Sequence, residues 1–534
     1  MKRDEIVVHD QSGTIAAPIA TAACVQEASL RDRAFLKIHA DEIKGRSVRG
    51  GLVTVTAQGL KFVLNTGSSM ILARLLTHED FGLMGMVVVV TGFLSLFSDL
   101  GLSMATIQRD VITHAQISTL FWINVAVGAT LALLVSALAP VLVVFYHEPR
   151  LFWMTIALAT TFLIGSFGAQ HSALLMRSMR FAARAKIEIS ALVVSVVVGV
   201  SMAAMGCAYW SLVGMTISGG LVGVAGLWLA VRWFPDLPRR GCGLRSMFHF
   251  GGTVTLNNLV VYIGYNAEKI LLGRYSGADV LGLYGRGYSL VNLPTTQLHA
   301  AMFNVAFPAL SRLQSDPPRL RNAFLKAYSM VLSMTIPATI ACVLFAEEVV
   351  RIVLGPKWLG AIPIFRLLAP TVLVFGLINP FGWFLTAGGW VVRSLKIALL
   401  IAPSVILGIA LGLRYGPPNG VGVAMGYSTM MMLLAFPVIA WSKHGTGITW
   451  GSLWNAMKQP VLSGLVAAAA GLAFKVALGG KLPALVCVTL GLGVTFGVYA
   501  WMLLIVMGQK PIYADLLRQV FERFRAKKEG DKSA

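Results

Sequence analysis

Two stretches of the sequence share a pattern that decides the fold. Residues 73–85 read ARLLTHEDFGLMG, and residues 273–285 read GRYSGADVLGLYG. The positions that match without a gap are Arg74 and Arg274, Gly82 and Gly282, Leu83 and Leu283, and Gly85 and Gly285. Each stretch lies between the first two apolar segments of a series of six. The pattern therefore predicts two halves with the same orientation, and transporters built from such halves bind their substrate between them.

The apolar segments around this pattern predict an all-α integral membrane protein. The chain is 56% hydrophobic and 13% charged, whereas a soluble domain has about 25% charged residues. A spanning helix needs about 20 apolar residues. Fourteen such spans are predicted, near residues 50–74, 81–106, 115–145, 151–175, 184–205, 208–231, 248–273, 281–310, 327–345, 364–387, 391–413, 420–441, 460–478 and 484–507. The first and seventh are amphipathic, so their polar sides are expected to face protein or a water-filled cavity.

These spans divide the chain into five predicted regions. They are a cytoplasmic N-terminal extension over 1–46, a six-helix bundle over 47–232, a second six-helix bundle over 245–442, two additional transmembrane helices over 458–508, and a basic cytoplasmic tail over 509–534. A pseudo-two-fold axis is expected to relate the two bundles. Within the extension, residues 26–44 fit either an amphipathic helix on the membrane surface or a disordered tail, and no signal peptide is expected.

The basic residues predict the orientation of the chain. The net charge is +21, which in a soluble protein suggests nucleic-acid binding. Here the charges lie in short loops that follow even-numbered spans, for example around Arg177, Arg232 and Arg312. Basic loops stay in the cytoplasm beside anionic lipid. Both termini are therefore predicted to be cytoplasmic, with membrane lipids and not nucleic acid as partners.

Signatures of catalysis and of metal binding are missing from the sequence. The five cysteines form no CxxC pair and no metal-binding spacing with histidine. There is no HExxH motif and no Walker A motif, and no GxSxG motif stands in a strand–turn–helix context. We therefore expect no metal, no cofactor and no enzymatic activity.

Five stretches resemble the polysaccharide-transporter family of the MOP flippase superfamily. They are Leu72–Met86, Ser98–Arg109, Tyr284–Pro294, Phe307–Arg321 and Leu354–Pro363. The resemblance covers about residues 45 to 445 and implies the MATE-like fold of twelve core spans in two bundles plus two further helices. It also implies a flippase of the bacterial inner membrane, which moves undecaprenyl-diphosphate-linked oligosaccharide repeat units from the cytoplasmic to the periplasmic leaflet by alternating access. The product is exopolysaccharide or lipopolysaccharide O-antigen, and a polymerase and a chain-length regulator are candidate partners.

Such a substrate indicates where its binding residues should lie. A diphosphate has to cross about 30 Å of hydrocarbon, and each cation kept within a span costs about 2.5–3.5 kcal/mol, which marks it as functional. The candidates for substrate binding are Lys61, Lys269, Arg286 and Arg366, with Asn257 and Asn258 on the polar side of the seventh span. We expect Lys61, Lys269 and Arg286 to share one cavity. The alternatives are an ion pair for Lys269 and snorkelling of Arg286 and Arg366 to the interface.

Two carboxyl groups and two further arginines complete the candidate residues. Asp99 and Glu268 are the acidic residues expected within the membrane, where either could take up a proton or a sodium ion and couple its gradient to transport. Asp99 could instead cap a helix break before Gly101. Arg74 and Arg274 lie at the outer ends of the repeat, which favours a gate or structural role.

Two other functions remain as alternatives. A membrane polysaccharide polymerase or ligase needs a large external loop to hold its acceptor, and the longest external connection here, residues 346–363, is short. A cation-coupled multidrug exporter would favour acidic and aromatic cavity residues. Four intramembrane cations against two acids favour an anionic substrate and hence the flippase.

Overall fold

The computed structural model describes residues 40–98, 103, 106–107, 112–238, 245–479 and 481–510. In the first part of the chain the helices are α2 (Ala40–Leu75), α3 (His78–Ser95), α5 (His114–Tyr146), α6 (Leu151–Arg177), α7 (Phe181–Ala204), α8 (Trp210–Val231) and α9 (Arg245–Ser311). The later helices are α10 (Pro317–Leu344), α11 (Ala346–Val353), η2 (Pro356–Trp358), α12 (Ala361–Leu368), α13 (Thr371–Ala387), α14 (Val391–Tyr415), α15 (Val421–Lys443), α16 (Trp450–Leu478) and α17 (Ala484–Trp501), which a π-helix over Met502–Val506 extends. The described residues contain no strand.

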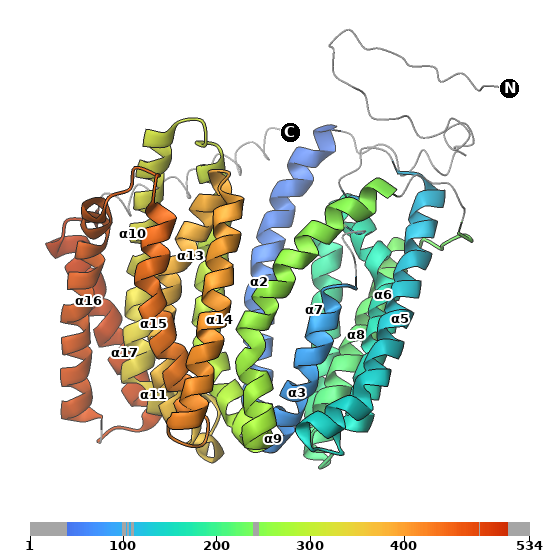
Figure 1. The fold of residues 1–534 in the computed structure, drawn as a ribbon, viewed down its shortest axis with the longest axis horizontal. Coiled ribbons are helices and arrows are strands. Elements are labelled where there is room, and N and C mark those ends of the chain that lie inside the picture. The colour runs from blue at the N-terminus through green and yellow to red at the C-terminus, as the bar shows by residue number, and fades with distance from the viewer. Residues whose placement is uncertain are drawn as a thin grey trace, which may run out of the picture.

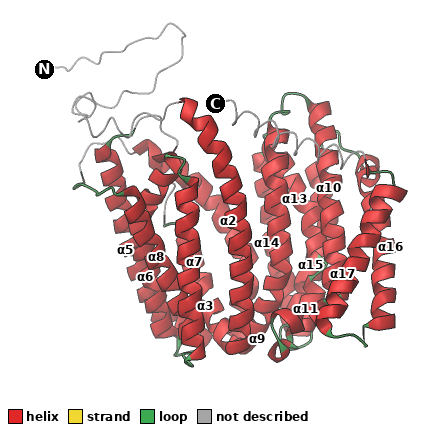
Figure 2. Ribbon diagram, turned by 180° about the vertical axis from the view of Figure 1, so that it is seen from behind, coloured by secondary structure: helices red, strands yellow, loops and turns green. Residues whose placement is uncertain are grey.

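The helices form two groups that meet at one edge of the molecule. Helices α5 to α8 lie on one side and α10 to α17 on the other, while α2, α3 and α9 run between them (Figures 1 and 2). Helix α2 begins at the upper edge of Figure 1, and α3 and α9 meet at the lower edge. The predicted boundaries at 47–232, 245–442 and 458–508 remain predictions, and the regions 1–46 and 509–534 fall largely outside the described residues.

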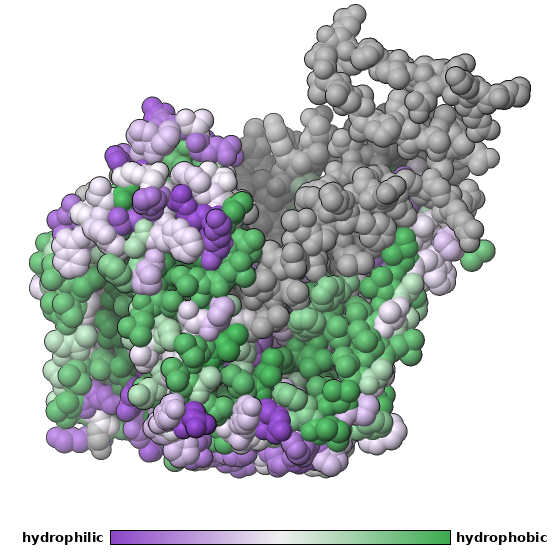
Figure 3. Space-filling view, in the orientation of Figure 1, coloured by the Kyte–Doolittle hydropathy of each residue, from purple (hydrophilic) through white to green (hydrophobic). Residues whose placement is uncertain are grey.

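The outer surface of the helices is apolar, as a bilayer requires. A hydrophobic band covers the middle of the molecule, and hydrophilic residues gather at its lower edge and over the top of one group of helices (Figure 3). Large side chains in this band are exposed, among them Leu133, Val144 and Leu229. Exposed apolar surface on this scale indicates contact with lipid.

Ten helical segments among the described residues, with α12 and α13 counted as one, are long and apolar enough to cross a membrane. Helices α2, α3 and the two segments of α9 do not meet this criterion, and they occupy the first, second, seventh and eighth predicted spans. Each of them carries charged residues, such as Lys61 in α2 and Lys269 in α9. The prediction of fourteen spans is compatible with this arrangement.

Several predicted span limits are wrong. Helices α2 and α10 begin at Ala40 and Pro317, whereas the predicted spans begin at 50 and 327, because a helix continues through polar residues at which an apolar window stops. Helix α3 ends at Ser95, although the second span was expected to reach residue 106. The tenth span begins at Ala361 and is interrupted before Thr371, where Pro370 lacks a backbone N–H.

The turn between the first two helices of each half is built differently in the two copies. Before α3, the Thr77 side chain accepts a hydrogen bond from the Asp80 N–H, and the Asp80 carboxylate accepts one from the Thr77 N–H at 2.9 Å, which is a capping box. The aligned position in the second copy is Gly277, with φ 83° and ψ 177° inside the 67-residue α9. Only glycine readily adopts this conformation. One residue therefore replaces the loop expected over 274–280.

The repeated glycines mark the crossing of the two halves. A Cβ atom built on Gly82 would lie 1.7 Å from the carbonyl oxygen of Ala278, and one built on Gly282 would lie 1.8 Å from that of His78. In the repeat, Gly82 corresponds to Gly282 and His78 to Ala278. The two contacts are thus one contact made twice about a pseudo-two-fold axis, as the matching sequences predicted.

Candidate functional site

The two halves close against each other at the lower edge of Figure 1, which lies opposite the edge where α2 begins. We call this contact, made by residues 73–82, 274–282 and 352–358, the distal seal, and this edge of the molecule the distal side. The Trp358 Nε1–H donates to the Ala73 carbonyl at 2.7 Å. The His78 ring lies with Nε2 2.7 Å from the Lys357 carbonyl oxygen and Nδ1 3.2 Å from an Asp279 carboxylate oxygen. These polar contacts and the glycine crossing close this side of the molecule.

The two candidate gate arginines lie at different contacts near this edge. The Arg74 Nη2–H donates to the carbonyl oxygen of Ile352 at 3.1 Å, so that it joins the two halves within the distal seal. Arg274 Nη1 lies 3.3 Å from His147 Nδ1, and its guanidinium lies 5.7 Å from the centre of the Phe145 ring. Arg274 therefore ties α9 to the end of α5.

A cavity of about 340 Å³ adjoins the distal seal between the two halves, and we call it the inter-half cavity. Helices α3 and α8 line it from the first half and α9 from the second. Lys269 and Arg286 are its charged lining residues, and its apolar wall includes Phe81, Met84 and Leu212. The structure thus brings two of the three predicted cations into one space.

Arg286 is held in this cavity by neutral groups. Its Nη1–H donates to the Ser69 hydroxyl of α2 at 2.9 Å, and its guanidinium carbon lies 3.6 Å from the centre of the Phe81 ring. The Lys269 Nζ donates to the Asn266 side-chain oxygen at 2.8 Å. Within the described part of the chain, no carboxylate lies within 4 Å of either cation. Among the described residues, neither positive charge therefore has an ion-pair partner.

Lys61 is placed elsewhere. It does not line the inter-half cavity but pairs with Glu188 of α7, whose second carboxylate oxygen accepts from Arg184 Nε at 2.7 Å. Glu188 is not among the residues predicted from the sequence. The spacing of four residues between Arg184 and Glu188, typical of an ion pair on a helix, was the available indication.

The other candidates are scattered. Arg366 is exposed in the last turn of α12 and does not line the cavity. Asn257 and Asn258 lie on α9, but their side chains are outside the described part of the structure, as is the whole of Asp99. Glu268 is 1% exposed, and neither of its carboxylate oxygens has a hydrogen-bond partner among the described residues.

The fold and the cavity define a class: an integral membrane protein of two related helical halves, closed on one side, with a cationic cavity between them. A family model described as polysaccharide biosynthesis protein matches residues 71–363. This is more than half of the chain, and the protein belongs to that family. The match confirms the resemblance found in the sequence.

Individual relatives agree with this assignment. The teichuronic acid biosynthesis protein TuaB of Bacillus subtilis (strain 168) is 32% identical over 305 residues, which cover 56% of this chain and 62% of TuaB. The lipopolysaccharide biosynthesis protein WzxC of Escherichia coli (strain K12) is 28% identical over 392 residues, covering 72% of this chain and 77% of WzxC. The chain thus spans less than two thirds of TuaB.

The solved structure of the lipid II flippase MurJ in an inward closed conformation is similar with a TM-score of 0.68. The two sequences are 12% identical, and the match covers 87% of this chain and 99% of MurJ. At this identity the likeness concerns the fold alone, and it confirms the predicted all-α fold class.

Proposed function

We propose that this protein is a flippase for lipid-linked oligosaccharide repeat units, which it translocates by alternating access. The observation that carries the proposal is the pair of cations, Lys269 and Arg286, in one cavity between the halves without a carboxylate partner among the described residues. Relatives named for lipopolysaccharide and teichuronic acid biosynthesis support a polysaccharide precursor as the cargo.

The two cations suit a diphosphate. A bare anion cannot enter a low-dielectric space, because its burial costs far more than the protein can supply. Arginine binds phosphate oxygens with two parallel N–H groups, and lysine binds them as a flexible point charge. Because Ser69 and Phe81 are neutral partners of Arg286, a diphosphate can displace them without leaving another charge unpaired.

The proposal also includes the lipid carrier, the direction of movement and the parts of the protein that move. Undecaprenyl diphosphate is the carrier, and movement runs from the cytoplasmic to the periplasmic leaflet of the inner membrane. Both termini are cytoplasmic, so the distal seal is the periplasmic gate. The bundles over 47–232 and 245–442 are the units that move. The process forms no covalent bond, in keeping with one relative that is named as a biosynthesis transport protein.

We further propose that Glu268 couples transport to an ion gradient. A fully buried carboxylate without a hydrogen-bond partner is costly unless it binds a proton or a cation. Glu268 precedes Lys269, so uptake of a positive charge there changes the potential beside the diphosphate site. Lys61, Arg366, Asn257 and Asn258 remain predicted contributors to substrate binding.

Polymer export by living cells tests the proposal. The protein is produced in a strain that depends on it for export, and Arg286→Ala is compared with Arg414→Ala. Arg414 is a matched control because it also lies near a hydroxyl and an aromatic ring, those of Tyr415, but on the exposed end of α14. We expect Arg286→Ala to abolish export at unchanged protein level, Arg286→Lys to retain part of it, and Arg414→Ala to export normally. Normal export by Arg286→Ala would show that the proposed site does not bind the substrate.

A further inference from the structure

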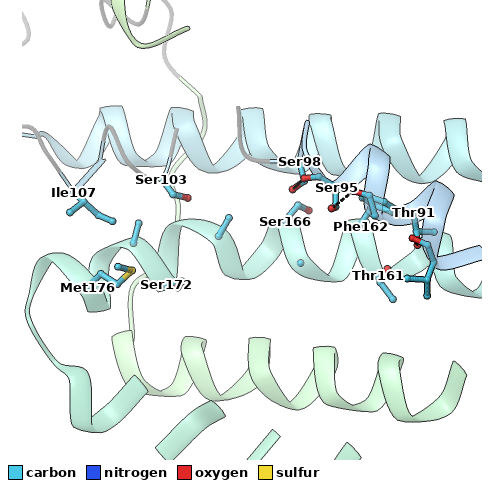
Figure 4. Close-up of a pocket in the computed structure, with 15 residues that line it drawn as sticks. Thr91, Ser95, Ser98, Ser103, Ile107, Thr161, Phe162, Ser166, Ser172 and Met176 are labelled. Carbon is cyan, nitrogen blue, oxygen red and sulfur yellow. Dashed lines mark hydrogen bonds between the residues drawn. The ribbon is translucent and has the colours of Figure 1, made fainter. Parts of the chain in front are cut away.

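A second cavity, of about 480 Å³, lies within the first half of the molecule between α3 and α6 (Figure 4). We call it the hydroxyl pocket, because its wall contains many serine and threonine side chains and no charged one among the described residues. The hydroxyl-bearing residues that α3, its C-terminal turn and α6 contribute are Thr91, Ser95, Ser98, Thr161, Ser166 and Ser172. The volume falls within the range of about 300–1,000 Å³ that is usual for ligand pockets.

The hydrogen bonds of these hydroxyls determine what the pocket offers to a ligand. The Ser95 hydroxyl donates to the Gly92 carbonyl at 2.6 Å, and that of Ser98 donates to the Ser95 carbonyl at 2.7 Å. On α6, the Ser166 hydroxyl donates to the Leu163 carbonyl at 2.7 Å. A hydroxyl has one proton and two acceptor lone pairs. With their protons used by their own helices, these groups present acceptor oxygens to the cavity.

Such a wall selects a ligand by its chemistry. An uncharged array of acceptors pairs with a molecule that carries many neutral O–H or N–H donors. The pocket also has apolar surface from Phe162, Ala169 and Met176, against which the C–H face of a ring can pack. A sugar combines both properties, whereas a lipid chain would leave the oxygens unpaired and a cation would find no carboxylate on the described wall.

The position of the pocket connects it to the diphosphate site. Val88 of α3 lines both the hydroxyl pocket and the inter-half cavity that contains Lys269 and Arg286. The two spaces therefore adjoin along one helix. A substrate with its diphosphate at the cations would carry its glycan next to the opening of the hydroxyl pocket.

We propose that the hydroxyl pocket binds the neutral sugars of the oligosaccharide that is joined to the diphosphate. This inference rests on the proposed flippase function and assigns to the glycan a site separate from that of the anion. The inter-half cavity holds the part common to all such substrates, and the hydroxyl pocket contacts the part that differs between them.

Two substitutions test the pocket without disturbing the cations. A Cβ atom on Gly165 would meet no atom within 4 Å, so Gly165→Val adds its side chain at an open point of the pocket wall. Gly497→Val on α17 is the matched control, since a Cβ atom there also meets no atom within 4 Å. Thr161→Val removes a hydroxyl at constant size. Its control is Thr130→Val, which loses the same kind of bond to a helix carbonyl on the exposed side of α5.

The purified proteins are titrated with two probes, a polyprenyl diphosphate and the same lipid diphosphate carrying a neutral oligosaccharide. We expect Gly165→Val to weaken binding of the glycosylated probe by about tenfold and Thr161→Val by about threefold, with the bare diphosphate and both controls unchanged. Equal weakening of both probes, or no change with either, would overturn the pocket assignment. Failure of the unsubstituted protein to bind either probe would instead overturn the flippase function.

Discussion

The close contact between Gly282 and the backbone of His78 predicts that Gly282→Ala opens the distal seal. The added methyl group would lie 1.8 Å from the His78 carbonyl oxygen. Helices α3 and α9 must then move apart by more than about 1 Å before the contact becomes tolerable. Because this carbonyl belongs to the first residue of α3, the movement separates the two halves at the distal seal.

The cost can be worked out from the bonds that hold the distal seal. Separation breaks the 2.7 Å hydrogen bond from Trp358 to Ala73 and the 2.7 Å contact between His78 and the Lys357 carbonyl. At about 0.5–1.5 kcal/mol for each bond, the closed state loses about 1–3 kcal/mol. This corresponds to a shift of about 5- to 150-fold from the closed toward the open state.

Thiol labelling measures this shift. A cysteine placed at Gly85 lines the inter-half cavity, and its Cβ atom lies at an ordinary distance of 3.5 Å from Leu281. With the native cysteines replaced, a membrane-impermeant reagent added on the distal side should label Gly85→Cys faster by about 5- to 150-fold when Gly282→Ala is present. Gly285→Ala is the control, because its Cβ atom meets nothing within 4 Å. Equal labelling rates in the two variants would refute the reasoning.

Three further substitutions probe the fold and the distal seal. Gly277→Ala forces an L-residue into a glycine conformation and should lower the free energy of unfolding by about 1–3 kcal/mol, seen as a lower melting temperature than that of Gly285→Ala. Trp358→Phe loses one hydrogen bond and should speed distal labelling of Gly85→Cys by about fivefold. Glu348→Gln leaves Lys475, whose Nζ lies 3.0 Å from the Glu348 carboxylate, without its counter-ion and should lower the free energy of unfolding by about 3 kcal/mol. Adding Lys475→Met should recover part of this stability, and no recovery would contradict an ion pair.

Much of the fold could be predicted from the sequence because its determinants are local. Apolar windows located the helices, and the repeated glycines indicated two similarly oriented halves. The limits of α2 and α10 were wrong because helical hydrogen bonding does not end where hydrophobicity does. The loop expected after Arg274 was wrong because the conformation of Gly277 alone changes the chain direction.

The site could be predicted only in part. Lys269 and Arg286 were found because a charge within an apolar span is costly, but the pairing of Lys61 with Glu188 depends on how α2 packs against α7. The hydroxyl pocket has no sequence pattern of its own. Serine and threonine bond to their own helix wherever they occur in an apolar span, so only the packing of α3 against α6 shows which of them converge.

The most direct test of the account is transbilayer movement of a fluorescent lipid-linked oligosaccharide in liposomes containing the purified protein. We expect the protein to accelerate this movement, Arg286→Ala and Lys269→Ala to remove the acceleration, and Arg414→Ala to retain it. Acceleration that persists unchanged in both cavity variants, or no acceleration by the unsubstituted protein, would contradict the claim that these two cations carry the diphosphate across the membrane.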